Sequence, residues 1–489
     1  MDRHLMQWIA PTLAMLIVAV DCAVACADSG DIQSQLNALH LALDEAEVTN
    51  ATVREELDEV RALRSENWLT NQRAASITEL VQDVLADSET RLNLQGNRTM
   101  FGWSDGFYLA SADGRFRLNI GGLMQTRFIA GWVGIRPQGP QPPPDFDQWR
   151  YGFELPRIQM TFDGHAFGNG LEYYLETGWG RYDPNGLTAD ITLMTFRMWE
   201  AWVKFRLTSD FAIKAGQFEL PFTRESLVRA QYQLAIERSL VDHRMGLGLT
   251  HGLEMVWASD DSRFMLAITN GSGALFHSPI WIVPDPVPPT AALNRDTLYS
   301  VTMRHEWKLL GDWNQFNQFT SPPGSERGVL VGIAGHRQNT ERDSSISVSG
   351  FPDGVFWGVT ADISMQFDGA SAYASVIYER VTDFSPAFSR LNWLAFIAQG
   401  STYVTNQTEL YARWETGGPD EEVFGGDEMM IVTVGFNHYI DGQDLKFSAD
   451  IGFSIGDVSL VMLNSQTGWQ FDSHKGDQVV VRTQLQMKF

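Results

Sequence analysis

Basic side chains recur between residues 115 and 244, and they are the residues best suited to chemistry in this sequence. Guanidinium groups bind phosphate and carboxylate oxygens through paired hydrogen bonds, so a series of them can replace the water that an anion loses. Apolar residues occupy alternate positions around residue 120, which leaves the arginines on the opposite, polar face. The predicted anion-binding candidates are Arg115, Arg117, Arg127, Arg157, Lys214, Arg224, Arg229, Arg238 and Arg244.

Carboxylates accompany the last four of these arginines and leave two interpretations open. Glu219, Glu225, Glu237 and Asp242 lie in the same stretch of chain. An arginine that is paired with a carboxylate braces a loop and contributes little field to a passing anion. The stretch therefore predicts either a weakly selective site or, if the arginines are free, an anion-selective one.

Other kinds of chemistry find no support in the sequence. It contains no H-E-x-x-H, P-loop, EF-hand or G-x-S-x-G pattern. The two cysteines, Cys22 and Cys26, lie within the first 30 residues, so the rest of the chain has no thiolate site and no disulfide. We expect no enzyme, metal or cofactor, and the net charge of -24 makes nucleic acid an unsuitable partner.

The N-terminus predicts export. Arg3 precedes an apolar run from Ile9 to Val20, and small residues follow it. This is a secretory signal peptide over residues 1–27, with Asp28 as the first mature residue. The alternative is a lipoprotein signal with an acylated Cys26.

Residues 28–66 carry a heptad pattern of apolar residues with charged residues between them. The pattern predicts a short α-helical coiled coil, with leucine at position a and β-branched residues at d favouring more than two helices. A single amphipathic helix is the alternative. Residues 67–100 are the predicted linker. The predicted core of the coil is Ile32, Leu36, Leu39, Leu43, Asn50, Val53, Leu57 and Val60.

From residue 101 to 489 the apolar pattern changes to a period of two, which indicates strands. Short turns such as "FDGAS" and "YIDGQD" alternate with long loops, as in outer-membrane barrels. The sixteen predicted strands are the segment around 116–132 and those near 150–165, 170–180, 194–207, 210–219, 249–258, 262–270, 297–309, 327–338, 354–367, 370–381, 391–403, 406–416, 427–440, 444–455 and 476–489.

The chain ends in "VVVRTQLQMKF", an amphipathic strand with an aromatic last residue. Val479, Val481, Leu485, Met487 and Phe489 share one face, whereas the polar residues share the other. A closed barrel pairs its last strand with its first, and its outer face must be apolar with aromatic rings at the interfaces. We therefore expect the barrel to close at this strand.

Several stretches resemble one family, the phosphate-selective porins O and P. They include "GFYLASADGRFRLNIGGLMQTRF", "FELPRIQMTFDGHAFGNGLEYYLE" and, most specifically, "IKAGQFELPFTRESLVRAQYQLAIERSL". The resemblance implies a trimeric, sixteen-stranded, antiparallel outer-membrane barrel whose third long loop, about Leu220–Leu247, folds into the lumen. It also implies that the barrel assembly machinery recognises Phe489. The apolar residues Leu227, Leu234, Ile236 and Leu240 independently require that this loop packs against something.

These observations predict an all-β membrane barrel, preceded by the coiled coil in the periplasm. The expected function is a water-filled channel for small hydrophilic solutes or anions, with membrane lipid and a homotrimer as partners. The alternative is a tether whose coil links the barrel to the cell wall.

Overall fold

A computed structural model describes residues 100–103, 106–135, 148–181, 194–272, 295–342, 354–382, 390–420, 429–455, 467–469 and 475–489. The chain divides into two compact units, Met1–Gly96 and Asn97–Phe489, and all described residues belong to the second. The predicted signal peptide and coiled coil, including the core residues Ile32 to Val60, lie outside the described residues. No helix among the described residues is long and apolar enough to cross a membrane.

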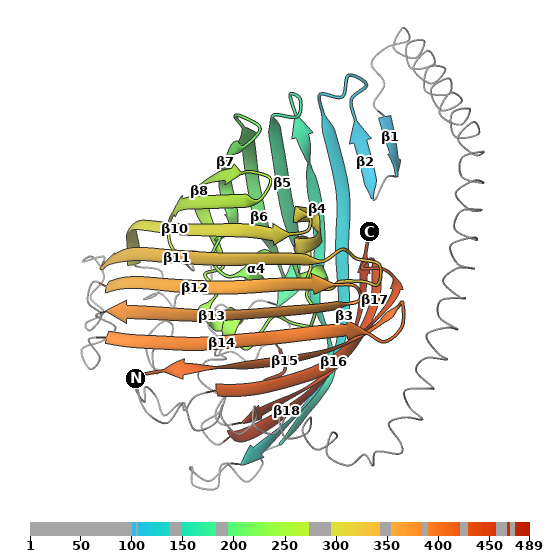
Figure 1. The fold of residues 1–489 in the computed structure, drawn as a ribbon, viewed down its shortest axis with the longest axis vertical. Coiled ribbons are helices and arrows are strands. Elements are labelled where there is room, and N and C mark those ends of the chain that lie inside the picture. The colour runs from blue at the N-terminus through green and yellow to red at the C-terminus, as the bar shows by residue number, and fades with distance from the viewer. Residues whose placement is uncertain are drawn as a thin grey trace, which may run out of the picture. The chain divides into compact units, whose positions relative to one another are not determined.

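Antiparallel strands form a closed barrel in which each of sixteen strands, β3 to β18, pairs with its neighbours in sequence (Figure 1). Two short strands, β1 and β2, precede the barrel. The strands are β1 (Met100–Trp103), β2 (Phe107–Ala110), β3 (Arg117–Ile135), β4 (Trp149–Ala166), β5 (Leu171–Arg181), β6 (Met194–Arg206), β7 (Phe211–Glu219), β8 (Leu249–Ala258), β9 (Ser262–Thr269), β10 (Arg295–Leu310), β11 (Gly328–Arg342), β12 (Gly354–Phe367), β13 (Ala370–Thr382), β14 (Arg390–Tyr403), β15 (Thr408–Pro419), β16 (Met429–Asp441), β17 (Leu445–Ile455) and β18 (Lys475–Lys488). The predicted sixteen-stranded barrel is confirmed.

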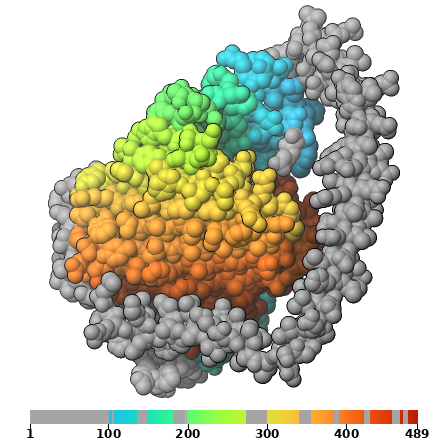
Figure 2. Space-filling view, in the orientation of Figure 1, coloured from blue at the N-terminus to red at the C-terminus, as the bar shows by residue number. Residues whose placement is uncertain are grey.

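Side chains alternate between the two faces of the wall because successive residues of a strand point in opposite directions. On β18, Arg482, Gln484 and Gln486 are buried inside the barrel, whereas Leu485 and Met487 are exposed outside. Apolar residues on the outer face are suited to lipid, and the polar ones must find partners within the lumen. Figure 2 shows the outer face that β10 to β14 form as a continuous surface.

The barrel closes where β18 meets β3. The last residue extends this seam, since the Phe489 nitrogen donates to the Gly122 carbonyl at 3.1 Å and the Gly122 nitrogen donates to the Phe489 carbonyl at 2.8 Å. A Cβ at Gly122 would lie 2.5 Å from Cζ of Phe489, so any side chain at this position would require the terminal ring to move. The strand predicted to close the barrel does so.

A hairpin of β1 and β2 continues the sheet beyond this seam. Strand β2 pairs Phe107 with Ile120 and Leu109 with Leu118, and so occupies the edge of β3 that β18 leaves free. Its outward residues, with Phe101 and Trp103 of β1, form an exposed apolar surface on which Phe101 is 81% exposed. The sequence analysis placed residue 100 in a linker and began the first strand around residue 116, and it missed this hairpin.

The turn between β2 and β3 corrects the expectation for Arg115. Gly114 adopts a positive φ of 65°, and the Asp113 carboxylate accepts a hydrogen bond from the Arg115 nitrogen at 3.1 Å. Such a turn is favoured by Asp and Gly. Arg115 is therefore an exposed turn residue rather than an inward-facing strand residue.

A bulge in β4 determines where Arg157 points. The register with β3 shifts between Gln125 and Arg127, so that Glu154 and Arg157 both face inward although they are three residues apart. Pro156 lies within the bulge, where its missing N–H costs the sheet no ladder hydrogen bond. The bulge thus places a carboxylate and a guanidinium on the same face.

Candidate permeation site

The connection from β7 to β8, residues 220–248, folds into the barrel as predicted and is called the in-folded loop below. It contains α4 (Arg224–Leu227), a 3-10 turn η2 (Ala230–Tyr232) and α5 (Leu240–Met245). The side chains of Thr223 and Ser239 cap the two helices by accepting hydrogen bonds from the Ser226 and Asp242 nitrogens. These caps satisfy backbone donors that would otherwise be buried without partners.

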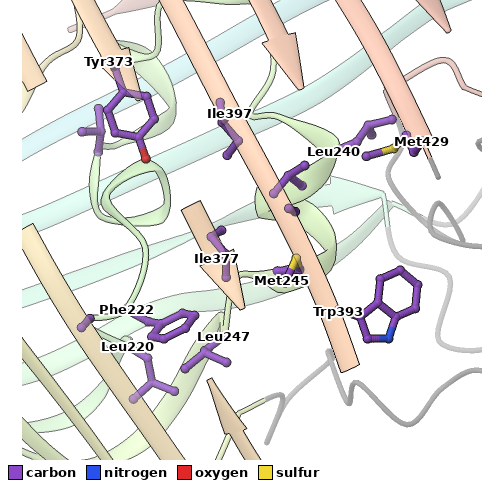
Figure 3. Close-up of a cluster of buried hydrophobic side chains, with 14 of the residues drawn as sticks. Leu220, Phe222, Leu240, Met245, Leu247, Tyr373, Ile377, Trp393, Ile397 and Met429 are labelled. Atoms are coloured by element: carbon purple, nitrogen blue, oxygen red, sulfur yellow. The ribbon is translucent and has the colours of Figure 1, made fainter. Parts of the chain in front are cut away.

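Apolar packing holds the in-folded loop against one side of the wall. Figure 3 shows Leu240 and Met245 of α5 beside Ile377 of β13 and Ile397 of β14, all of which are buried. Each such side chain contributes about 1.5–3 kcal/mol when it is removed from water. The loop's apolar pattern is thereby explained by a core inside the barrel. This cluster also contains Phe222, Val228, Leu234, Val241, Leu247, Trp393, Tyr411, Met429 and Ile431.

Glu237 ties the same loop to β3 and β4. Its carboxylate accepts hydrogen bonds from Arg127 Nη1 at 2.7 Å and from Arg157 Nη1 and Nη2 at 2.9 and 2.8 Å. Arg127 also lies 2.7 Å from Glu154. Burial raises the pKa of Glu237, but the charges of Arg157 and Arg127 outweigh it and hold the pKa well below its usual range.

A second carboxylate anchors α4 to α5. Glu225 is fully buried and accepts hydrogen bonds at 2.6 Å from both the backbone nitrogen and the hydroxyl of Ser239. Arg413 of β15 lies 3.6 Å from it. Burial raises the pKa of Glu225, and the nearby charge of Asp242 adds to the rise, more than Arg413 and Ser239 lower it.

The remaining arginines of the in-folded loop are engaged as well. Arg224 is buried and donates to the Phe316 carbonyl, and Arg238 donates to the Val228 carbonyl at 2.9 Å. In these contacts the two arginines brace the loop, which is one of the two roles that the sequence left open for them.

Two arginines of the loop stack on aromatic rings of the wall. Arg244 lies 4.4 Å from the ring of Trp393 and 3.5 Å from the Glu379 carboxylate. Arg229 lies 4.3 Å from the ring of Tyr174 and donates to its hydroxyl. The Arg229 side chain is 39% exposed, the highest value among the charged side chains of the loop for which an ion pair is described.

A second segment enters the barrel from the opposite end. Residues 311–327 connect β10 to β11 and contain the 3-10 helix η4 (Trp313–Asn317). The Phe319 nitrogen donates to the Tyr232 carbonyl of the in-folded loop at 3.2 Å, and its ring packs 4.8 Å from Tyr373. The two segments meet inside the lumen. The sequence analysis missed this entry because it expected short turns at this end.

The water-accessible part of the interior lies along β4 to β7. Inward-facing residues of the described parts of β11 to β18 are nearly all buried, because the two in-folded segments cover them. By contrast, those of β4 to β7 are mostly partly exposed. This set, called the open wall below, includes Gln159, Asp163, Glu172, Glu176, Glu200, Trp202, Lys204 and Lys214.

Charges on the open wall occur in pairs. Lys204 lies 3.0 Å from Glu172, and Arg206 forms a further ion pair with the same carboxylate. Lys214 faces inward as predicted and lies 2.6 Å from Glu254 of β8. The register places Glu172, Lys204, Lys214 and Glu254 in one row across β5 to β8, so two neighbouring lysines are flanked by a carboxylate on each side.

Arg117 also lies on the inward face, but at the end of β3 that carries the hairpin. Its Nε donates to the Asn119 side chain at 2.8 Å, and its guanidinium lies 4.6 Å from the Tyr108 ring of β2. Of the nine predicted basic residues, the structure brings Arg127 and Arg157 together at Glu237. It distributes the others over separate contacts rather than aligning them as a ladder.

The sequence matches the family "Phosphate-selective porin O and P" over residues 142–276. The matched region contains β4 to β9, with the open wall and the in-folded loop. The resemblance inferred from the sequence motifs is thus confirmed for this part of the chain. No curated protein is significantly similar to the whole sequence.

Solved porin structures are similar to this chain at low sequence identity and with TM-scores below 0.5. An anion-selective porin from Comamonas acidovorans is 9% identical, with 76% of this chain and 99% of that chain covered at a TM-score of 0.49. The outer-membrane channel DcaP of Acinetobacter baumannii is also 9% identical, with 80% and 100% covered and a TM-score of 0.49. Salmonella typhi OmpF, in complex with daunomycin, is 12% identical, with 80% and 100% covered and a TM-score of 0.47.

Proposed function

We propose that this chain, which resembles the phosphate-selective porins O and P, is an outer-membrane porin for passive diffusion of small hydrophilic solutes. The observation that carries the proposal is the open wall, a band of partly exposed polar side chains inside a closed barrel with an apolar outer face. A pore selects by its width and by the charges close to the path of the solute.

Weak charge selectivity fits the ion pairs better than a phosphate site does. An anion-binding ladder requires guanidinium groups with free donors along the path. Here Arg127 and Arg157 are committed to Glu237, and Lys204 and Lys214 to Glu172 and Glu254. Phosphate would have to displace these carboxylates before it could bind.

The test is conductance of the purified, refolded protein in a planar lipid bilayer. We expect stepwise conductance in KCl, a reversal potential close to zero in a KCl gradient, and no block by millimolar phosphate. Strong anion preference with phosphate block would replace weak selectivity by a phosphate-type site. Absence of any conductance from protein that is demonstrably folded would refute the channel itself.

We infer further that the protein is exported by its signal peptide and assembles as a homotrimer supported by the coil of residues 28–66. The heptad pattern supports this inference, and the place of Phe489 at the seam fits a role in recognition by the barrel assembly machinery. The test compares the mass of the detergent-solubilised full chain with that of a chain lacking residues 31–66. A trimer for the first and less stable or smaller oligomers for the second are expected, whereas a monomeric full chain would contradict the inference.

A further inference from the structure

Two aromatic side chains stand next to each other on the inner face of β5 and β6, where Trp202 belongs to the open wall and Tyr174 beside it is buried. Tyr174 of β5 and Trp202 of β6 are paired in register, and their rings stack at a centroid distance of 5.4 Å and an interplanar angle of 23°. The register continues from Trp202 to Gly216 of β7 and then to Gly252 of β8, both partly exposed. These two neighbouring inward positions therefore add no side chain that could cover the partly exposed Trp202 ring.

Polar groups surround this aromatic pair and fix its orientation. The indole nitrogen of Trp202 donates to the Glu200 carboxylate at 2.8 Å, and the Tyr174 hydroxyl donates to Glu176 at 2.6 Å. The guanidinium of Arg229 lies 4.3 Å from the Tyr174 ring centroid. Trp202 is the partly exposed member of the aromatic pair, and it is the one whose register neighbour on β7 is a glycine.

Groups of both signs of charge lie close to the stack. Arg229 lies 3.9 Å from Glu176, and Lys214, which is paired with Glu254, lies 5.7 Å from the Trp202 ring centroid. An anion at this position would be attracted by the cations but repelled by the carboxylates beside them, and a cation would experience the reverse. A neutral solute with hydroxyl groups, in contrast, can accept hydrogen bonds from the cations and donate to the carboxylates.

We propose that the Tyr174–Trp202 pair is a binding site for neutral, hydroxyl-rich ring solutes, of which a pyranose sugar is the simplest. The apolar C–H face of the ring would stack on Trp202, while its hydroxyls contact Lys204, Glu200 and their neighbours. Aromatic surfaces with a few placed polar groups are the usual composition of a small-molecule site. The inference rests on the proposed channel and names the class of solute that dwells in it.

The test is block of the open-channel KCl current by maltotriose, measured in the same bilayer as the conductance. We expect concentration-dependent current noise in the unaltered protein. Trp202→Ala should raise the half-blocking concentration by roughly threefold to tenfold, the size expected for one lost ring contact. Trp202→Phe retains a ring and should retain most of the block. The matched control is Trp257→Ala, which removes an exposed tryptophan from the outer face of β8.

Two further results separate this inference from the channel itself. Polyethylene glycol of the same hydrodynamic radius lacks rings and should block without any dependence on Trp202. Normal KCl conductance with no maltotriose block, or with equal block in Trp202→Ala, would overturn the ring site and leave the channel intact. If Trp202→Ala fails to fold, Trp202→Leu takes its place, because leucine fills the position without a ring; weaker block would support the ring site and equal block would overturn it. Loss of all conductance in the unaltered protein would refute the channel first.

Discussion

Glu237→Gln is the most informative single substitution, since Glu237 neutralises two arginines of the lumen. The glutamine keeps an acceptor near Arg127 and Arg157 but removes the negative charge. Leaving a buried charge uncompensated costs about 3–5 kcal/mol. The substitution should therefore loosen the in-folded loop, while the barrel, whose strand ladders are untouched, stays closed.

The same substitution adds one unit of positive charge beside the path. For an ion that passes about 8 Å away in a medium of effective dielectric constant about 40, Coulomb's law gives on the order of 1 kcal/mol. This corresponds to roughly fivefold more anion and fivefold less cation in dilute salt, before screening reduces both.

The assay is the reversal potential in a dilute KCl gradient, with Asp260→Asn in the exposed β8–β9 turn as the control. We expect Glu237→Gln to become anion-preferring and to lose the shift at 1 M salt, and the control to match the unaltered protein. An unchanged reversal potential for folded Glu237→Gln would refute the reasoning that the charge of Arg127 and Arg157 acts on the path once Glu237 no longer neutralises it.

Three further outcomes are expected. Gly122→Val should displace the Phe489 ring and destabilise the closed barrel by about 1–3 kcal/mol, seen as a lower midpoint of unfolding by urea in detergent; an unchanged midpoint would contradict the contact. Phe319→Ala removes the ring that packs on Tyr373 and should raise single-channel conductance; no increase would show that residues 311–327 lie outside the path. Because the pKa of Glu225 is raised in the folded state, ionisation opposes the folded loop, and the loop should lose stability as pH rises from about 4.5 to about 7. Open-channel noise should then be greater at pH 8 than at pH 5, and Glu225→Gln should remove the difference.

The barrel was predictable from sequence because lipid and lumen impose opposite polarity on alternate residues over 8 to 19 positions. Strands as short as β1 and β2 hold only two residues per face, too few for a pattern. The segment "WNQFNQF" between β10 and β11 has no period that distinguishes an in-folded turn from a solvated one. These are the two elements that the sequence analysis missed.

For the basic residues of the candidate site, too, the local sequence pattern predicts only part of the structure. Their types and inward phases followed from the local pattern for Arg127, Arg157 and Lys214, but their partners did not. Arg244 pairs with Glu379, which is 135 residues away in sequence, and no local rule assigns such a partner. Whether an arginine is free or engaged is a tertiary property, and it decides selectivity.

The in-folded loop also determines the order in which this barrel can be built. The Leu240 nitrogen donates to Glu415, 175 residues later, and the Leu234 carbonyl accepts from Asn437, 203 residues later. The apolar side of the loop thus has no native partner until the last strands have been delivered. Once β18 has joined β3, however, a closed cylinder surrounds the position that the loop must occupy. The loop and the later strands therefore depend on one another during assembly, because the native contacts of the loop are complete only when β15 and β16 are in place.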